Sequence, residues 1–163
     1  MDNFRITIIA SKGTLDWGVQ TFIYAVTADA LGYEVEIFFT SYGVELLRKD
    51  VPRKITLYDN PGMPIPLINS RWFPNVLRSL PGVQTLITRM MERKMKYSGI
   101  PSLEEFRSLC LTSGITFIAS QTSLGLLNIN PNELIPEVAE YSNFSNEALI
   151  IANQNQNSLF LQF

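Results

Sequence analysis

Histidine is absent from this chain of 163 residues, and cysteine occurs only once, as Cys110. Without histidine the chain lacks the commonest general base and the commonest metal ligand, which excludes Ser-His and Cys-His catalytic pairs. A single cysteine forms no disulfide within the chain and no CxxC motif for zinc or redox chemistry. We therefore expect neither a bound metal nor a cofactor.

Long apolar runs and a strong net charge are also missing. No apolar stretch approaches the roughly 20 residues that a membrane-spanning helix needs. The start Met-Asp-Asn-Phe-Arg leads into a strand rather than a signal sequence. The formal net charge is −2, which provides no overall electrostatic footprint for nucleic acid. We expect a cytoplasmic protein that binds neither nucleic acid nor a membrane.

Hydrophobic residues make up 46% of the chain, and its length suits one domain over residues 1–163. Short runs rich in β-branched and aromatic residues alternate with segments of helical periodicity, which predicts an α/β domain with a mainly parallel sheet of about five strands. The predicted strands are 5–10, 34–40, 55–58, 115–119 and 158–163. The predicted helices are 15–31, 80–97 and 102–112, with short helices from Val44, over 124–127, after Asn130, and up to Ala152 from a cap at Asn143 or Ser145.

Several helix ends have recognisable signals. Ser102 followed by Glu105 predicts a capping box, and Thr14 is expected to cap the first helix. Gly32 and Gly114 stand where helices end and a left-handed backbone conformation is needed. The first helix is expected to bury Leu15, Val19, Phe22, Ile23, Val26 and Ala30.

The middle of the chain, residues 52–100, has a different composition. Six prolines between residues 52 and 81 predict an irregular segment, of the kind that forms a lid, a binding loop or a subunit contact. A methionine-rich helix follows, and residues 70–100 contain six basic residues and one acidic residue. We interpret this basic face as a solvated surface or an oligomer contact, with an anion or partner site as the alternative.

Polar turns follow three of the predicted strands. In an open α/β sheet, ligands bind at the carboxyl ends of the strands, so these turns are the candidate ligand-binding crevice. Ser120 lacks a histidine base and is interpreted as a ligand-lining residue or a helix cap rather than a nucleophile. The crevice residues are Lys12, Gly13 and Thr14; Ser41, Tyr42 and Gly43; and Ser120, Gln121, Thr122 and Ser123.

Cys110 is the only candidate for thiol chemistry. Helical spacing places it on one face with Leu103, Phe106 and Leu109, which predicts a buried and inert thiol. A reactive thiol would need exposure and positively charged neighbours, and Arg107 is the one nearby candidate. Cys110 is therefore kept as a catalytic residue only in an alternative hypothesis.

The order and spacing of these segments resemble the DsrE/DsrF family, and within it the DsrE2-like branch of sulfur-relay proteins. The resemblance covers the first strand and turn, the run from Ala28 to Arg48, the basic helix and the segment Ile100–Phe106. It continues through Gly114–Ser123, Asn132–Ile135 and the closing strand. The resemblance implies a three-layer α/β sandwich with Rossmann-like topology, assembly into a dimer-based or trimer-based homo-oligomer, and cysteine persulfides that pass sulfur to a partner protein.

One departure from that family bears on the chemistry. The branch typically has a cysteine where this chain has Ser120, and a serine hydroxyl cannot hold a persulfide. The first hypothesis is therefore a non-catalytic or accessory member that recognises a small anion or the persulfide of a sulfur-carrier protein. The alternatives are an active sulfurtransferase that uses Cys110 and a structural oligomerisation subunit.

Overall fold

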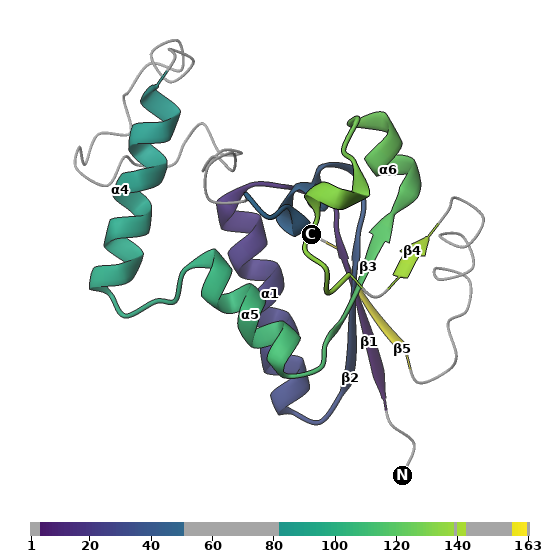
Figure 1. Cartoon of the computed structure of the whole chain (residues 1–163). Helices are drawn as coiled ribbons and strands as arrows, with labels where there is room; N and C mark the ends of the chain where they lie inside the picture. The colour runs from purple at the N-terminus through teal and green to yellow at the C-terminus, as the bar shows by residue number, and fades with distance from the viewer. Residues whose placement is uncertain (1–3, 51–81, 139, 143–157, 163) are drawn as a thin grey trace.

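The computed structural model describes residues 4–50, 82–138, 140–142 and 158–162, and within them five strands form one parallel sheet. The order across the sheet is β4-β3-β2-β1-β5 (Figure 1). The predicted α/β class is confirmed. The strands are β1 (Arg5–Ala10), β2 (Glu34–Phe39), β3 (Thr116–Ser120), β4 (Glu140–Ser142) and β5 (Ser158–Gln162).

Four of these strands were predicted, within one or two residues at their ends. No strand was predicted at β4, which has only three residues. The predicted strand 55–58, the proline-rich segment 52–81 and the last helix up to residue 152 lie outside the described residues.

Strand register brings polar side chains into pairs along the sheet. Arg5 lies opposite Glu34, and their side chains form an ion pair with an Nη2–Oε1 distance of 2.6 Å. Thr7 lies opposite Glu36, and its hydroxyl donates a hydrogen bond of 2.6 Å to the carboxylate. These cross-strand pairs help to fix the register in which the two strands end together.

The helices connect the strands, and two of them cover one face of the sheet. In Figure 1, α1 and α5 lie side by side against that face, whereas α4 stands apart from the sheet. Among the described residues, none of the helices is long and apolar enough to cross a membrane. The helices are α1 (Leu15–Ala30), η1 (Ser41–Leu47, a 3-10 helix), α4 (Val83–Tyr97), α5 (Leu103–Thr112), α6 (Gln121–Leu126) and η2 (Pro131–Glu133, a 3-10 helix).

Both faces of the sheet are buried at its centre. Ile8 and Ile37 point into the main hydrophobic core together with residues of α1 and α5. Thr7, Phe38 and Ile118 alternate with core residues along their strands and are also at most 4% exposed. Burial on both faces is typical of a parallel sheet in a layered α/β protein.

The predicted helix ends are largely confirmed. Ser102 and Glu105 form a reciprocal capping box at the start of α5. Gly32 and Gly114 have φ values of 87° and 82°, in the left-handed region that favours glycine. Thr14 occupies the N-cap position of α1, but the expected capping bond is absent because its hydroxyl binds the carboxylate of Asp16 at 2.5 Å.

The predicted buried faces of the two long helices were partly wrong. Ile23 on α1 is 39% exposed and Leu109 on α5 is 45% exposed, and Ala30 is exposed as well. The face of α1 that packs inward instead includes Gly18, Thr21, Ala25 and Ala28. At Gly18 there is no room for a larger residue, because a Cβ there would lie 2.6 Å from the Leu46 side chain. Close approach of the helix to its neighbours selects that face.

Candidate functional site

The three polar turns predicted to form a crevice lie together at the carboxyl edge of the sheet. The backbone N–H of Ser41 donates to the hydroxyl oxygen of Ser123 at 2.8 Å, which joins the turn after β2 to the turn after β3. Gly43 lies against the end of β1, where a Cβ would stand 1.9 Å from the carbonyl oxygen of Ala10. Only glycine allows this approach without a backbone shift.

The turn after β1 packs equally closely on its neighbour. A Cβ on Gly13 would lie 2.2 Å from the backbone oxygen of Tyr42. Together these contacts bring residues 12–14, 41–43 and 120–123 into one region, which we call the polar rim.

Hydroxyl groups of the polar rim bind one another below its surface. The Ser120 oxygen accepts hydrogen bonds from the backbone N–H of Ser123 at 3.1 Å and from its hydroxyl at 2.9 Å. Thr40 lies within 3.3 Å of the same Ser123 hydroxyl. Ser120 is fully buried and caps α6, so its oxygen is engaged in structure.

Other residues of the polar rim face solvent. Ser41 adopts a φ of 48°, which is unusual for a residue other than glycine, and it is exposed. Tyr42 is 66% exposed, and Gln121 and Thr122 are exposed beside it on the chain. A partner that approaches this edge would meet these side chains first.

Lys12 contributes the positive charge of the polar rim. Its ammonium lies 3.9 Å from the centroid of the Trp17 ring, a cation–π contact that holds the side chain over the first turn of α1. The half-buried lysine is thus the one side chain of the rim that would attract an anion by charge.

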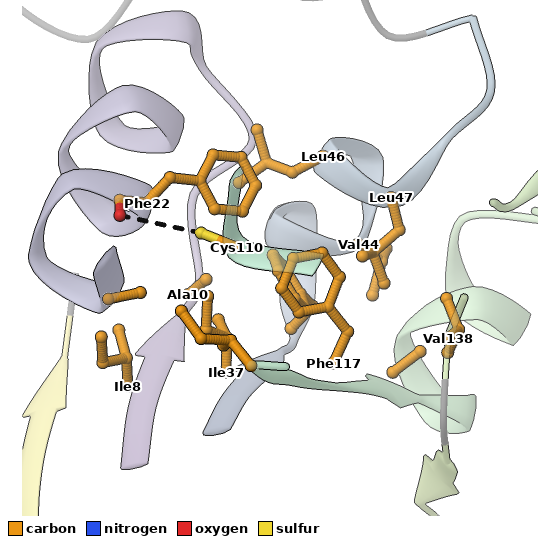
Figure 2. Packing of buried hydrophobic residues seen from close by; sticks show 14 of the residues in the cluster. Ile8, Ala10, Phe22, Ile37, Val44, Leu46, Leu47, Cys110, Phe117 and Val138 are labelled. Carbon is orange, nitrogen blue, oxygen red and sulfur yellow. Dashed lines mark hydrogen bonds between the residues drawn. The ribbon is translucent and has the colours of Figure 1, made fainter. Parts of the chain in front are cut away.

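Cys110 lies in the hydrophobic core, as predicted (Figure 2). Its side chain is fully buried, and its thiol donates to the backbone oxygen of Phe22 at an Sγ–O distance of 3.8 Å. Burial raises the pKa of the Cys110 thiol to about 12. A thiol in this environment is not ionised near neutral pH and is inaccessible to another sulfur atom.

Two buried arginines were missed by the sequence reasoning. Arg107 is 9% exposed and donates to the backbone oxygens of Leu46 and Arg48, both at 2.9 Å. Burial lowers the pKa of Arg107, although the charges of nearby glutamates oppose this effect. The guanidinium thereby ties α5 to the end of η1, and no local sequence signal identifies such a partner.

Arg48 holds together a second group of charges. Its guanidinium binds Asp50 at 3.1 Å and Glu133 at 2.6 Å, and lies 3.6 Å from Glu45. Burial alone would lower the pKa of Arg48, but the hydrogen bond and the charges of these carboxylates have the larger combined effect, so its pKa is raised. Within the described part of the chain, no group of three or more His, Cys, Asp or Glu residues is arranged to hold a metal ion.

Comparison with known proteins identifies a family and a relative that this chain resembles. Residues 2–160 match the model of the DsrE/DsrF/DrsH-like family. The chain is 45% identical over 142 residues to a protein of Allochromatium vinosum named sulfur carrier protein DsrE2, covering 87% of this chain and 89% of that protein.

Two solved structures share the fold at low sequence identity. The ychN protein from E. coli has a TM-score of 0.55 at 10% identity, with all of both chains covered. MTH1491 from Methanobacterium thermoautotrophicum, a protein of unknown function, has a TM-score of 0.56 at 14% identity, covering 99% of this chain and 100% of that one. The parallel sheet, the family match and the sulfur-carrier relative agree, and the chain belongs to the DsrE/DsrF/DrsH-like family.

Proposed function

We propose that this protein is an accessory member of a sulfur-relay system that recognises a small anion or the persulfide of a partner protein and forms no persulfide itself. The observation that carries this proposal is the burial of Cys110, the one cysteine in the chain. Persulfide formation requires a thiolate that reaches another sulfur atom. A fully buried thiol with a pKa of about 12 meets neither requirement.

The polar rim supports the recognition part of the proposal. Lys12 supplies a positive charge, and exposed Ser41, Gln121 and Thr122 supply hydrogen-bonding groups. A persulfide or thiosulfate is an anion that such groups can bind without covalent chemistry. The relative named as a sulfur carrier makes sulfur species the first class of ligand to test.

Mass spectrometry of the intact protein tests whether sulfur is accepted. We expect no added sulfur when the native protein is incubated with a polysulfide donor, and modification of Cys110 when the same donor acts on protein unfolded in guanidinium chloride. The unfolded sample shows that the donor is active. Stoichiometric sulfur on the native protein would establish the alternative, an active sulfurtransferase that uses Cys110.

Calorimetric titration with thiosulfate tests recognition. Lys12→Ala should weaken binding by about tenfold to a hundredfold, since a hydrogen bond with a charged group contributes about 1.5–3 kcal/mol. Lys49→Ala is the matched control, because it removes the same charge from a lysine that binds the backbone oxygen of Asn132 outside the rim. Equal weakening by both variants, or no binding to the unaltered protein, would leave the rim without a role in anion recognition.

We also propose that residues 1–163 form a single cytoplasmic domain that assembles into a homo-oligomer. The family match over residues 2–160 supports a single unit. Sedimentation velocity of the full chain tests its assembly, and a monomer across the micromolar range would refute it.

A further inference from the structure

A groove of about 540 Å³ lies between α4 and the first turn of α5, apart from the polar rim. In Figure 1, α4 stands beside the body of the protein, and the segment that leads into α5 crosses between them. A groove of this volume is within the range of sites that hold small molecules, about 300–1,000 Å³. Its two sides and its floor have different chemical character.

One side of the groove is basic. Arg89, Arg93 and Lys96 are spaced so that they share one face of α4, and all three line the groove. All three are exposed, and none of them forms an ion pair with another described residue. Arg89 acts electrostatically on Glu92 and Lys96 on Glu105, so a carboxylate of a ligand would compete with these two glutamates for the cations.

The opposite side is acidic and comes from the first turn of α5. Glu104 is exposed and lines the groove, whereas the carboxylate of Glu105 is bound to the backbone N–H of Ser102 in the capping box. Glu92 on α4 lines the groove as well, and burial, with the charge of Glu104, raises its pKa although Arg89 opposes this. A cationic group in the groove would relieve the unfavourable proximity of Glu92 and Glu104.

The floor is apolar. Leu15 and Leu103 are at most 6% exposed and reach the groove from the starts of α1 and α5. Ile100 is 42% exposed and borders the same space. An aliphatic group seated here would be removed from water against side chains that are already held in the core.

We propose that this groove binds a dipolar, peptide-sized molecule with carboxylates, an ammonium group and an aliphatic middle. The carboxylates would bind Arg89, Arg93 and Lys96, and the ammonium would bind Glu104. The aliphatic middle would lie on the apolar floor. None of the residues of the polar rim lines this groove, and the proposal does not depend on the proposed role in sulfur relay.

The tripeptide glutamyl-leucyl-glutamate with a free amino terminus is a suitable probe. At pH 7 it carries three carboxylates, one ammonium group and one aliphatic side chain. Calorimetry of the full chain should detect binding at millimolar or lower concentration. The affinity should fall as salt rises to about 1 M, where the Debye length is about 3 Å.

Three variants assign the contacts. Arg93→Gln should weaken the binding of the probe about tenfold, through the loss of a charge-assisted hydrogen bond. Glu104→Gln should weaken the binding of the free tripeptide. It should leave the binding of the N-acetylated tripeptide unchanged, because that form lacks the ammonium group. Lys94→Gln is the matched control, since Lys94 is an exposed cation on the same helix that does not line the groove.

Several outcomes would overturn the proposal. They are the absence of binding at about ten millimolar probe, equal binding of lysyl-leucyl-lysine, and equal weakening by Lys94→Gln and Arg93→Gln. Self-association that Arg93→Gln abolishes would assign the groove to a second copy of the chain instead. Thermal unfolding of each variant shows whether a loss of binding reflects a loss of fold.

Discussion

The buried thiol of Cys110 should make the protein less stable in alkaline solution, by an amount that the structure allows us to calculate. The pKa of Cys110 is about 12 in the folded protein and should be about 8.5 in the unfolded chain. Because the folded pKa is the higher one, the stabilising contribution is complete below about pH 8.5. It is lost as the pH rises from there toward about 12.

The size of the effect follows from the difference between the two pKa values. Each pH unit between them costs about 1.4 kcal/mol, so the folded state should lose about 2 kcal/mol by pH 10 through this thiol alone. Cys110→Ala removes the titrating group. At neutral pH the substitution should cost about 1 kcal/mol, because it leaves a small cavity beside Phe22.

Guanidinium unfolding of both proteins at pH 7.5, 9 and 10 measures the difference. The original protein should be the more stable at pH 7.5, and its advantage should vanish or reverse by pH 10. Tyrosine and lysine titrations are common to both proteins and cancel in the comparison. Parallel stability profiles from pH 7.5 to pH 10 would show that Cys110 is not a buried thiol, and would remove the main support for the accessory role.

Four further substitutions, one of them a control, test contacts that hold the fold together, each by thermal or denaturant unfolding. Gly43→Ala should cost about 2 kcal/mol or more, because its Cβ would stand 1.9 Å from the last carbonyl oxygen of β1. Gly125→Ala, which meets nothing within 4 Å, should be neutral or stabilising, and equal costs would contradict the packing. Arg107→Leu should cost about 2–5 kcal/mol by leaving two buried carbonyl oxygens unpaired, and an unchanged midpoint would show that water replaces it. Ser102→Ala should cost about 1 kcal/mol through the lost helix cap, and a cost near zero would mean that Glu105 alone holds the helix start.

Local signals in the sequence predicted the features that depend on neighbouring residues. The capping box of Ser102 and Glu105 and the left-handed glycines at 32 and 114 involve only a few residues of chain each. The meeting of the three turns was also predictable, because parallel strands end at one edge of a sheet. These features depend on residues that are close in the chain, or on the direction in which the strands of a parallel sheet run.

Contacts between distant side chains could not be predicted in the same way. Helical periodicity favoured Ile23 and Leu109 as buried residues, but Gly18 and Arg107 occupy the inward faces. Each choice depends on what lies opposite: the side chain of Leu46 leaves no room beside Gly18, and free carbonyl oxygens at the end of η1 accept from Arg107. A buried charge is satisfied only by partners that the fold brings from elsewhere.

The hydrogen bonds at the end of β3 depend on the hydroxyl oxygen of Ser120. The Ser120 oxygen accepts two hydrogen bonds from Ser123, whose own hydroxyl oxygen accepts from the backbone of Ser41. A thiol at residue 120 would be larger and a weaker acceptor, so Ser120→Cys should loosen the link between the turns after β2 and β3. The serine is therefore part of the support for the polar rim, and this fits a protein that binds at the sheet edge without chemistry there.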